Sequence, residues 1–346
     1  MTDYSLYIAA IYVFTFFVVL FTRFRSLKVG NRVALAMASI SFLVAALRPS
    51  YFPDVDTYEL MFEFAASGEF SNATYWIAHG EPGFKILSYL IYISGLDYTG
   101  FLVAMASISF LSLLYISRIS GVPFAYLWFC YFSFYFITRD LGAIRLSIAS
   151  HLIVIFFIHK AFIWRIVAII VASLSFQYTA FIVVLAKLMS RIKINLFSIS
   201  LLFLVSYICS FYFNLENFKF FIPEKQMISY EGTMQFEASG WRMIFPLTRN
   251  LFFASIIYFL LKNETRSEYF RIWIWAAFFS SSFYIMFSDM LIVQQRLSAY
   301  FGAVVPLALA FIMHRRSITN GNFFIVVCLC VLNFVSLFYF NDFVWR

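Results

Sequence analysis

Residues 141–158 read LGAIRLSIASHLIVIFFI, an apolar run with one arginine, Arg145, near its start. A run of this length and composition is typical of a membrane-spanning helix. An arginine inside such a helix costs about 2.5–3.5 kcal/mol on insertion scales, so it usually faces the protein interior and has a partner or a task. The stretch therefore predicts both a span and a functional residue.

The composition of the chain extends this interpretation to its full length. Of its 346 residues, 63% are hydrophobic and 12% are charged, as in polytopic helical membrane proteins. The apolar runs are continuous rather than alternating, which favours helices over the strands of a membrane barrel. We therefore expect an all-α polytopic integral membrane protein with a single transmembrane domain, residues 1–346.

The apolar runs predict about twelve transmembrane helices, with both termini outside. The expected spans are 4–22, 33–47, 98–117, 122–138, 141–158, 163–176, 178–190, 195–213, 244–261, 272–288, 297–313 and 322–340. The run 84–95 is too short to cross, so we expect a re-entrant or interfacial helix there. The short runs 163–176 and 178–190 are expected to form a hairpin with Gln177 and Tyr178 at its outer tip.

Membrane topology, rather than a nucleic-acid partner, explains the net charge of +8. Basic residues concentrate in short connections such as RFRSLKVGNR at 23–32, and the positive-inside rule places these connections in the cytoplasm. The four cysteines all lie in apolar runs, so no disulfide framework is indicated. The four histidines lack metal-ligand spacing and no nucleotide-binding motif occurs, so we expect metal-independent chemistry without a cofactor.

Two long connections, 48–82 and 215–241, fall outside in this topology. Long ordered loops on one face of a bundle usually carry the binding chemistry. In the first, Asp56 is followed three residues later by a glutamate, a capping-box pattern that predicts a helix through about residue 66 with Asp56 at its N-cap. Asp54 is then the freer carboxylate, and Tyr58 lies one helical turn from it.

Charged residues at comparable positions in several spans suggest a site for a buried anion. Arg139 and Asp140 immediately precede the run that contains Arg145, and Arg249 and Arg296 lie in later runs. Guanidinium groups bind phosphate through paired hydrogen bonds, so a phosphate or diphosphate is the expected ligand. The structural alternative is that Arg145 pairs with Asp140 or with backbone carbonyls.

Short motifs occur in order over roughly residues 50–300. They are DVDTY at 54–58, EPGF at 81–84, IRLSIA at 144–149, QYTA at 177–180, and Arg296 followed by Tyr300. This order resembles the EpsG-like family of Wzy-type polysaccharide polymerases, with its DxxxY loop, E-x-G-F turn, I-R-Q-x-I-A helix and H-x-S/T-A hairpin. Two residues depart from the family pattern: Leu146 stands where glutamine is usual, and Gln177 where histidine is usual. Gln177 can hydrogen-bond a sugar or phosphate, but it cannot act as a base.

The resemblance implies a glycosyltransferase that polymerises oligosaccharide repeat units carried on undecaprenyl diphosphate. It implies a reaction at the outer, periplasmic face of a bacterial inner membrane, with O-antigen or a related surface polysaccharide as the product. The implied fold is a bundle like that of the glycosyltransferase-C enzymes. The implied partners are the lipid-linked oligosaccharide, membrane lipid and a chain-length regulator protein, and no nucleic acid.

This chemistry assigns roles to the candidate residues. Breaking an anomeric carbon–oxygen bond releases a lipid diphosphate, whose negative charge Arg145 could stabilise with other arginines as helpers. Glu81 and Asp54 compete for the role of the base that takes a proton from the acceptor hydroxyl. The expected substrate-binding residues are Arg139, Asp140, Arg249, Arg296, Gln177, Tyr178, Tyr58, Asp56, His79 and Tyr300.

Two other function classes stay open, and a third is disfavoured. A transporter or flippase for a lipid-linked sugar would also gather arginines, but it would typically place charges at the membrane midplane on broken helices and show inverted repeats. A membrane glycosyltransferase that adds one sugar from a polyprenyl phosphate would share most of these features. A sugar O-acetyltransferase is disfavoured because the cytoplasm-facing histidine that it needs is not evident.

Overall fold

The computed structural model describes residues 3–50, 52, 54–66, 81–213, 241–265, 267–288, 290–315 and 319–340. Regular structure in these residues is helical, without any strand, which confirms the all-α prediction. The described helices form two compact units. The chain passes from the first to the second after Gln177 and returns at Pro306. A single transmembrane domain over 1–346 stays a prediction. His79 and, apart from Trp241, the predicted loop 215–241 lie outside the described residues.

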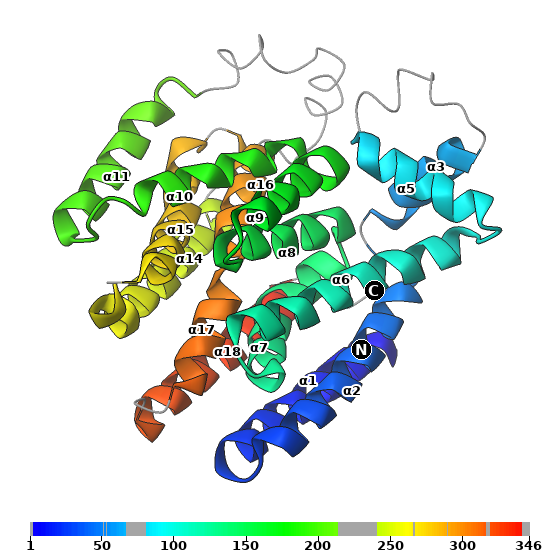
Figure 1. The fold of residues 1–346 in the computed structure, drawn as a ribbon, viewed down its shortest axis with the longest axis horizontal. Helices are drawn as coiled ribbons and strands as arrows, with labels where there is room; N and C mark the ends of the chain where they lie inside the picture. The colour runs from blue at the N-terminus through cyan, green and yellow to red at the C-terminus, as the bar shows by residue number, and fades with distance from the viewer. Residues whose placement is uncertain are drawn as a thin grey trace. The chain divides into compact units, whose positions relative to one another are not determined.

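The first unit combines the N-terminal helices with the two C-terminal ones. Its elements are α1 (Asp3–Phe24), α2 (Leu27–Ala46), α3 (Val55–Ala66), α5 (Pro82–Ile93), α6 (Tyr98–Ser120), α7 (Phe124–Tyr131), η1 (Phe132–Asp140), α8 (Ile144–Ile158), α9 (Phe162–Val171), η2 (Ala172–Phe176), α17 (Val305–His314) and α18 (Asn320–Phe340). The elements η1 and η2 are π-helices that continue α7 and α9. Figure 1 shows α1 and α2 packed side by side, and α3 packed on α5.

Caps set the ends of several of these helices. At the start of α2, Ser26 Oγ accepts a hydrogen bond from Val29 N (3.3 Å). At the start of α6, Asp97 Oδ1 accepts one from Gly100 N (2.9 Å). The helix α6 ends at Gly121, whose φ of 70° lies in the left-handed region that glycine adopts without a side-chain clash. These local signals place the ends of α6 close to the predicted span 98–117.

Aromatic and polar contacts hold the core of the first unit together. Tyr12 of α1 stacks on Phe334 of α18 with ring centroids 3.5 Å apart. Its hydroxyl also hydrogen-bonds Ser133 Oγ of η1 (2.9 Å), and Asn333 Nδ2 donates to the carbonyl of Ser133 (2.7 Å). Three elements far apart in the sequence therefore meet around Ser133.

The second unit is built around α15. Its elements are η3 (Tyr178–Val183), α10 (Val184–Met189), α11 (Leu196–Ser210), α14 (Trp241–Leu261), η4 (Lys262–Glu264), α15 (Glu268–Met286) and α16 (Leu291–Gly302). The helix α15 packs against α10, α11, α14 and α16. Its residues from Ile272 to Tyr284 are all buried, as expected for the central helix of a bundle.

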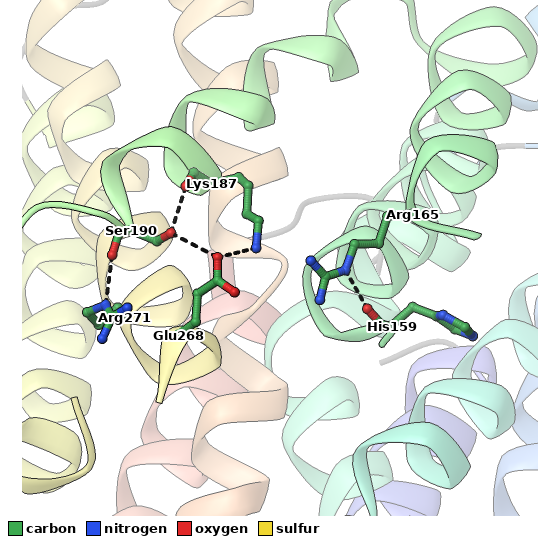
Figure 2. A network of polar contacts seen from close by, with 6 residues as sticks. All are labelled: His159, Arg165, Lys187, Ser190, Glu268 and Arg271. Carbon is green, nitrogen blue, oxygen red and sulfur yellow. Dashed lines mark hydrogen bonds and ion pairs between the residues drawn. The ribbon is translucent and has the colours of Figure 1, made fainter. Parts of the chain in front are cut away.

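Polar contacts fix the turns beside several of these helices (Figure 2). In the second unit, Glu268 at the start of α15 forms an ion pair with Lys187 of α10 and lies 3.5 Å from Ser190 Oγ. In the first unit, Arg165 Nε donates a hydrogen bond to the carbonyl of His159, closing the turn between α8 and α9. These basic residues belong to connections that the positive-inside rule assigns to the cytoplasm.

Six described helical stretches are long and apolar enough to cross a membrane. They are Tyr4–Phe24, Leu27–Ala46, Tyr98–Ser120, Ile244–Glu264, Val293–His314 and Asn320–Tyr339. Each coincides with a predicted span, so the chain is a multi-pass membrane protein. Other predicted spans correspond to shorter helices, such as α8 and α11 with 15 residues each; the count of about twelve stays a prediction.

Two predicted irregularities are present locally. The helix α5 has 12 residues, too few to cross about 30 Å of hydrocarbon at about 1.5 Å per residue. It therefore fits the expected re-entrant or interfacial helix. At Gln177 the backbone becomes extended, with φ −160° and ψ 105°, so the helical conformation is interrupted between η2 and η3 as predicted.

The orientation of this region can be tested by cysteine labelling. Tyr178 is 55% exposed, and Lys193 lies exposed in the next basic connection. In a variant without native cysteines, we expect Tyr178→Cys to react with a membrane-impermeant maleimide added on the non-cytoplasmic side of the membrane. Lys193→Cys should react only after permeabilisation, because basic connections stay in the cytoplasm. The reverse labelling pattern would contradict the predicted orientation of the second half of the chain.

Candidate functional site

The start of α3 places Tyr58 inside the first unit. The helix begins at Val55, directly after Asp54, whose φ of 64° is left-handed, a conformation that aspartate tolerates better than most residues. Tyr58 N donates to the Asp54 carbonyl (2.9 Å), which confirms their predicted one-turn separation. The predicted capping box is wrong: the turn at Asp54 starts the helix two residues early, so Asp56 lies in its first turn. Both aspartates are exposed, whereas Tyr58 is buried.

The EPGF segment positions Glu81 at the start of α5. Glu81 has an extended backbone and Pro82 begins the helix, where its missing N–H is no loss. A Cβ on Gly83 would lie 2.7 Å from the Cα of Ser175, so only glycine lets α5 lie this close to η2. The Glu81 side chain does not cap α5. It is therefore available for a partner elsewhere.

That partner is Arg145. Arg145 Nη1 donates to Glu81 Oε2 at 2.7 Å, and the two side chains are only 12% and 10% exposed. The guanidinium carbon also lies 5.6 Å from the ring centroid of Tyr58 and 5.3 Å from that of Phe84. The structural alternative in which Asp140 is the carboxylate partner is wrong, and two predicted site residues from α5 and α8 meet instead.

The uncharged side chain of Tyr58 lies beside this ion pair. Its helix lies outside the candidate spans, and burial, together with the nearby Asp54 carboxylate, raises the pKa of the phenol above its ordinary value. The nearby Arg145 guanidinium acts in the opposite direction and lowers the pKa of the phenol. At neutral pH the side chain therefore offers a hydroxyl dipole and an aromatic face, but no charge.

Asp140 is held by three hydroxyl groups. Its Oδ1 accepts hydrogen bonds from Ser109 (2.6 Å) and Ser147 (2.8 Å), and its Oδ2 accepts one from Tyr131. The residue is 3% exposed. Since both carboxylate oxygens are engaged, the geometry favours a positioning role for Asp140 at the junction of η1 and α8 over the predicted direct contact with substrate, which stays a prediction.

Arg139 is also buried at this junction. Its guanidinium carbon lies 3.4 Å from the ring centroid of Tyr135, and the residue is 2% exposed. The π-helical segment η1 carries both Arg139 and Asp140. In a π-helix each backbone hydrogen bond spans five residues instead of four, and such segments are frequent at functional sites. The apolar pattern of 122–138 gives no sign of this change in helical pitch.

Arg48 is a buried cation that the sequence analysis did not single out. It follows the C-cap of α2 and is 5% exposed, and its Nη1 donates to the carbonyl of Asp140 at 2.7 Å. The available signal was weak, because an arginine at the end of an apolar run usually marks the membrane interface. The structure instead places its charge inside the first unit.

The remaining predicted residues that the structure describes are best considered within their own units. Tyr300 of α16 is fully buried and its hydroxyl hydrogen-bonds Thr179 Oγ1 (2.9 Å) within the second unit. Arg249 Nη2 lies 3.4 Å from Asn250 Oδ1, and Arg296 is exposed. As diphosphate-binding partners of Arg145, these arginines remain predictions. Gln177 is 7% exposed and Tyr178 is 55% exposed.

The described helices and the buried arginine–carboxylate pair define a class: a multi-pass helical membrane protein with a charged site in its interior. Among the described residues, no group of three His, Cys, Asp or Glu side chains could hold a metal ion. The EpsG family model matches residues 32–345, and the chain belongs to this family. Membership indicates a membrane protein with a polysaccharide-polymerase-like, glycosyltransferase-type function. No curated protein and no solved structure matched the chain.

The ion pair can be tested by removing each charge. We expect Glu81→Gln to destabilise the purified protein by about 3–5 kcal/mol, because it leaves the buried Arg145 charge without a carboxylate. The double variant Glu81→Gln/Arg145→Gln should be more stable than either single variant. The matched control is Glu268→Gln, whose ion pair has a 45% exposed carboxylate and should contribute at most about 1 kcal/mol. Denaturant unfolding in mild detergent measures the stability of the two single variants, the double variant and the control. If Glu81→Gln were as stable as the wild type, the predicted stabilisation by the ion pair would be contradicted.

Proposed function

We propose that this protein is a polymerase that joins oligosaccharide repeat units carried on undecaprenyl diphosphate, at the periplasmic face of a bacterial inner membrane. The observation that carries the proposal is the Arg145–Glu81 pair, which is about nine-tenths buried and whose guanidinium lies near the rings of Tyr58 and Phe84. It combines a cation for a phosphate leaving group with a carboxylate for an acceptor proton. Family membership supplies the polysaccharide-polymerase context.

The reaction transfers a glycosyl group from one lipid carrier to another chain. An acceptor hydroxyl oxygen bonds to the anomeric carbon of the donor, while the bond from that carbon to the diphosphate oxygen breaks. The electron pair leaves with the lipid diphosphate, and the acceptor proton moves to a carboxylate. The residues therefore have two tasks: to stabilise growing negative charge on the leaving group and to remove one proton.

Partner exchange at Arg145 links these tasks. An incoming diphosphate competes with Glu81 for the guanidinium, and its higher charge favours the exchange. Arg145 is then bound to the oxygen on which charge develops, and Glu81 is released with a basic oxygen close to the reacting bond. Tyr58 and Phe84 keep water away, which strengthens both interactions. Asp54 is the second candidate base, but its exposure leaves it in competition with water.

Substitution of Arg145 tests the function. Arg145→Lys keeps the charge but loses the two-pronged geometry that suits a phosphate. Loss of one charge-assisted hydrogen bond, about 1.5–3 kcal/mol, corresponds to about a tenfold to hundredfold slower transfer. Arg145→Ala should be slower still. The matched control is Arg118→Lys, an exposed arginine in the last turn of α6, which should keep normal activity.

The readout is the glycan profile of a deletion strain that expresses each variant, measured together with the amount of membrane-inserted protein. We expect single repeat units to remain while long chains are lost, with less transfer per molecule of inserted protein. Long chains made by a stable Arg145→Ala protein would contradict the assignment. Loss of every repeat unit from the outer face of the membrane would indicate a transporter or flippase, and a repeat unit lacking one sugar would indicate a single-sugar glycosyltransferase.

A further inference from the structure

Arg48 carries a buried charge that no described carboxylate neutralises. Among the described residues, the guanidinium makes one hydrogen bond, from Nη1 to the Asp140 carbonyl, and its buried Nε and Nη2 atoms have no hydrogen-bond partner there. An arginine keeps its charge at any physiological pH. Burying such a charge without compensation is costly, and proteins usually retain it where a ligand supplies the missing anion.

Tyrosine hydroxyls act on the charge of Arg48 more strongly than any carboxylate does. The groups that act on its charge are those of Tyr58, Tyr98 and Tyr4, followed by the more weakly coupled Asp140. The Tyr4 hydroxyl donates to the carbonyl of Val44 (2.6 Å) and the Tyr98 hydroxyl to that of Val55 (2.9 Å). These neutral groups provide dipoles but no negative charge. Burial accordingly lowers the pKa of Arg48.

Tyr58 relates Arg48 to the Arg145 site. Both guanidinium groups act on the Tyr58 hydroxyl, so this phenol is a shared neighbour of the two arginines in the first unit. Glu81 balances one of the two positive charges, and the second has no described counterpart. An anion that displaces Glu81 and satisfies both arginines must carry at least two negative charges on linked groups.

We infer that Arg48 is a second anion-binding residue of this site, which contacts one phosphate of a diphosphate while Arg145 contacts the other. The inference rests on the proposed function for the diphosphate nature of the ligand. Asp140 is the positioning residue: hydrogen bonds from Ser109, Ser147 and Tyr131 fix its side chain, and its carbonyl holds Arg48 Nη1. The buried polar cluster of η1, α6 and α8 thereby orients a residue that contacts the ligand.

The test compares a diphosphate with a monophosphate. Full-length protein in detergent is titrated with farnesyl diphosphate and with farnesyl monophosphate. Wild-type protein should prefer the diphosphate. Arg48→Gln should weaken diphosphate binding by about tenfold to a hundredfold, the value of one charge-assisted hydrogen bond, and leave monophosphate binding nearly unchanged. Arg145→Gln should weaken both. Arg32→Gln, an exposed arginine on α2, is the matched control and should bind both ligands like wild type.

Two further measurements separate ligand contact from folding. Arg48→Lys keeps the charge and should retain part of the diphosphate preference, and it serves in place of Arg48→Gln if that variant does not fold. Inorganic pyrophosphate, which has no prenyl chain, should compete for the site and lose affinity in the Arg48 variants by the same factor as the lipid. A loss confined to the lipid would overturn the inference, because Arg48 would then act on the prenyl chain rather than on the anion.

The outcomes distinguish this inference from the proposed function. A folded Arg48 variant that keeps the full diphosphate preference, with only a lower unfolding temperature, would overturn the inference and leave the Arg145 site intact. Wild-type protein that binds the two farnesyl phosphates equally, or binds neither, would overturn the diphosphate ligand and the role of Arg48 with it.

Discussion

The buried ion pair between Arg145 and Glu81 is the constraint on which the described site depends. A guanidinium inside an apolar helix needs a counter-charge, because an unpaired charge in the interior is strongly destabilising. The short helix α5 supplies it, and Gly83 allows the start of α5 to approach η2 closely enough. Tyr58 then closes the site from α3. In the described part of the connection between α2 and α6, residues from α3 and from the start of α5 therefore gather around one positive charge in α8.

The charges of the two buried arginines are compensated to different extents, and this difference bears on how the proposed site would bind an anion. Arg145 has a carboxylate in the ligand-free protein, whereas Arg48 has one backbone carbonyl and dipolar neighbours. A site fully neutralised in the empty state would bind an anion weakly, since every new contact would replace an existing one. A site with one uncompensated cation sacrifices stability and gains affinity for a doubly charged ligand.

The sequence predicted the helices better than the contacts between them. Long apolar runs fix where helices lie, because backbone groups in hydrocarbon must be satisfied within the helix. The partner of Arg145 lies 64 residues away in sequence, and no local pattern identifies it. The prediction of a cap at Asp56 was wrong because Asp54 adopts a left-handed conformation, and the helix begins directly after it. Arg48 was missed because composition alone does not separate an interfacial arginine from a buried one.

The departure at Gln177 bears on which group removes the proton. The resemblance places histidine at this position, and an amide cannot accept a proton at physiological pH. The proposed mechanism therefore assigns the role of the base to a carboxylate. Glu81 is 7% exposed and paired with Arg145, whereas Asp54 is exposed at the start of α3. Water solvates an exposed carboxylate and weakens it as a base, whereas one released from its arginine in a low-dielectric site gains proton affinity. This contrast favours Glu81, whose basicity would rise only when the diphosphate displaces it from Arg145.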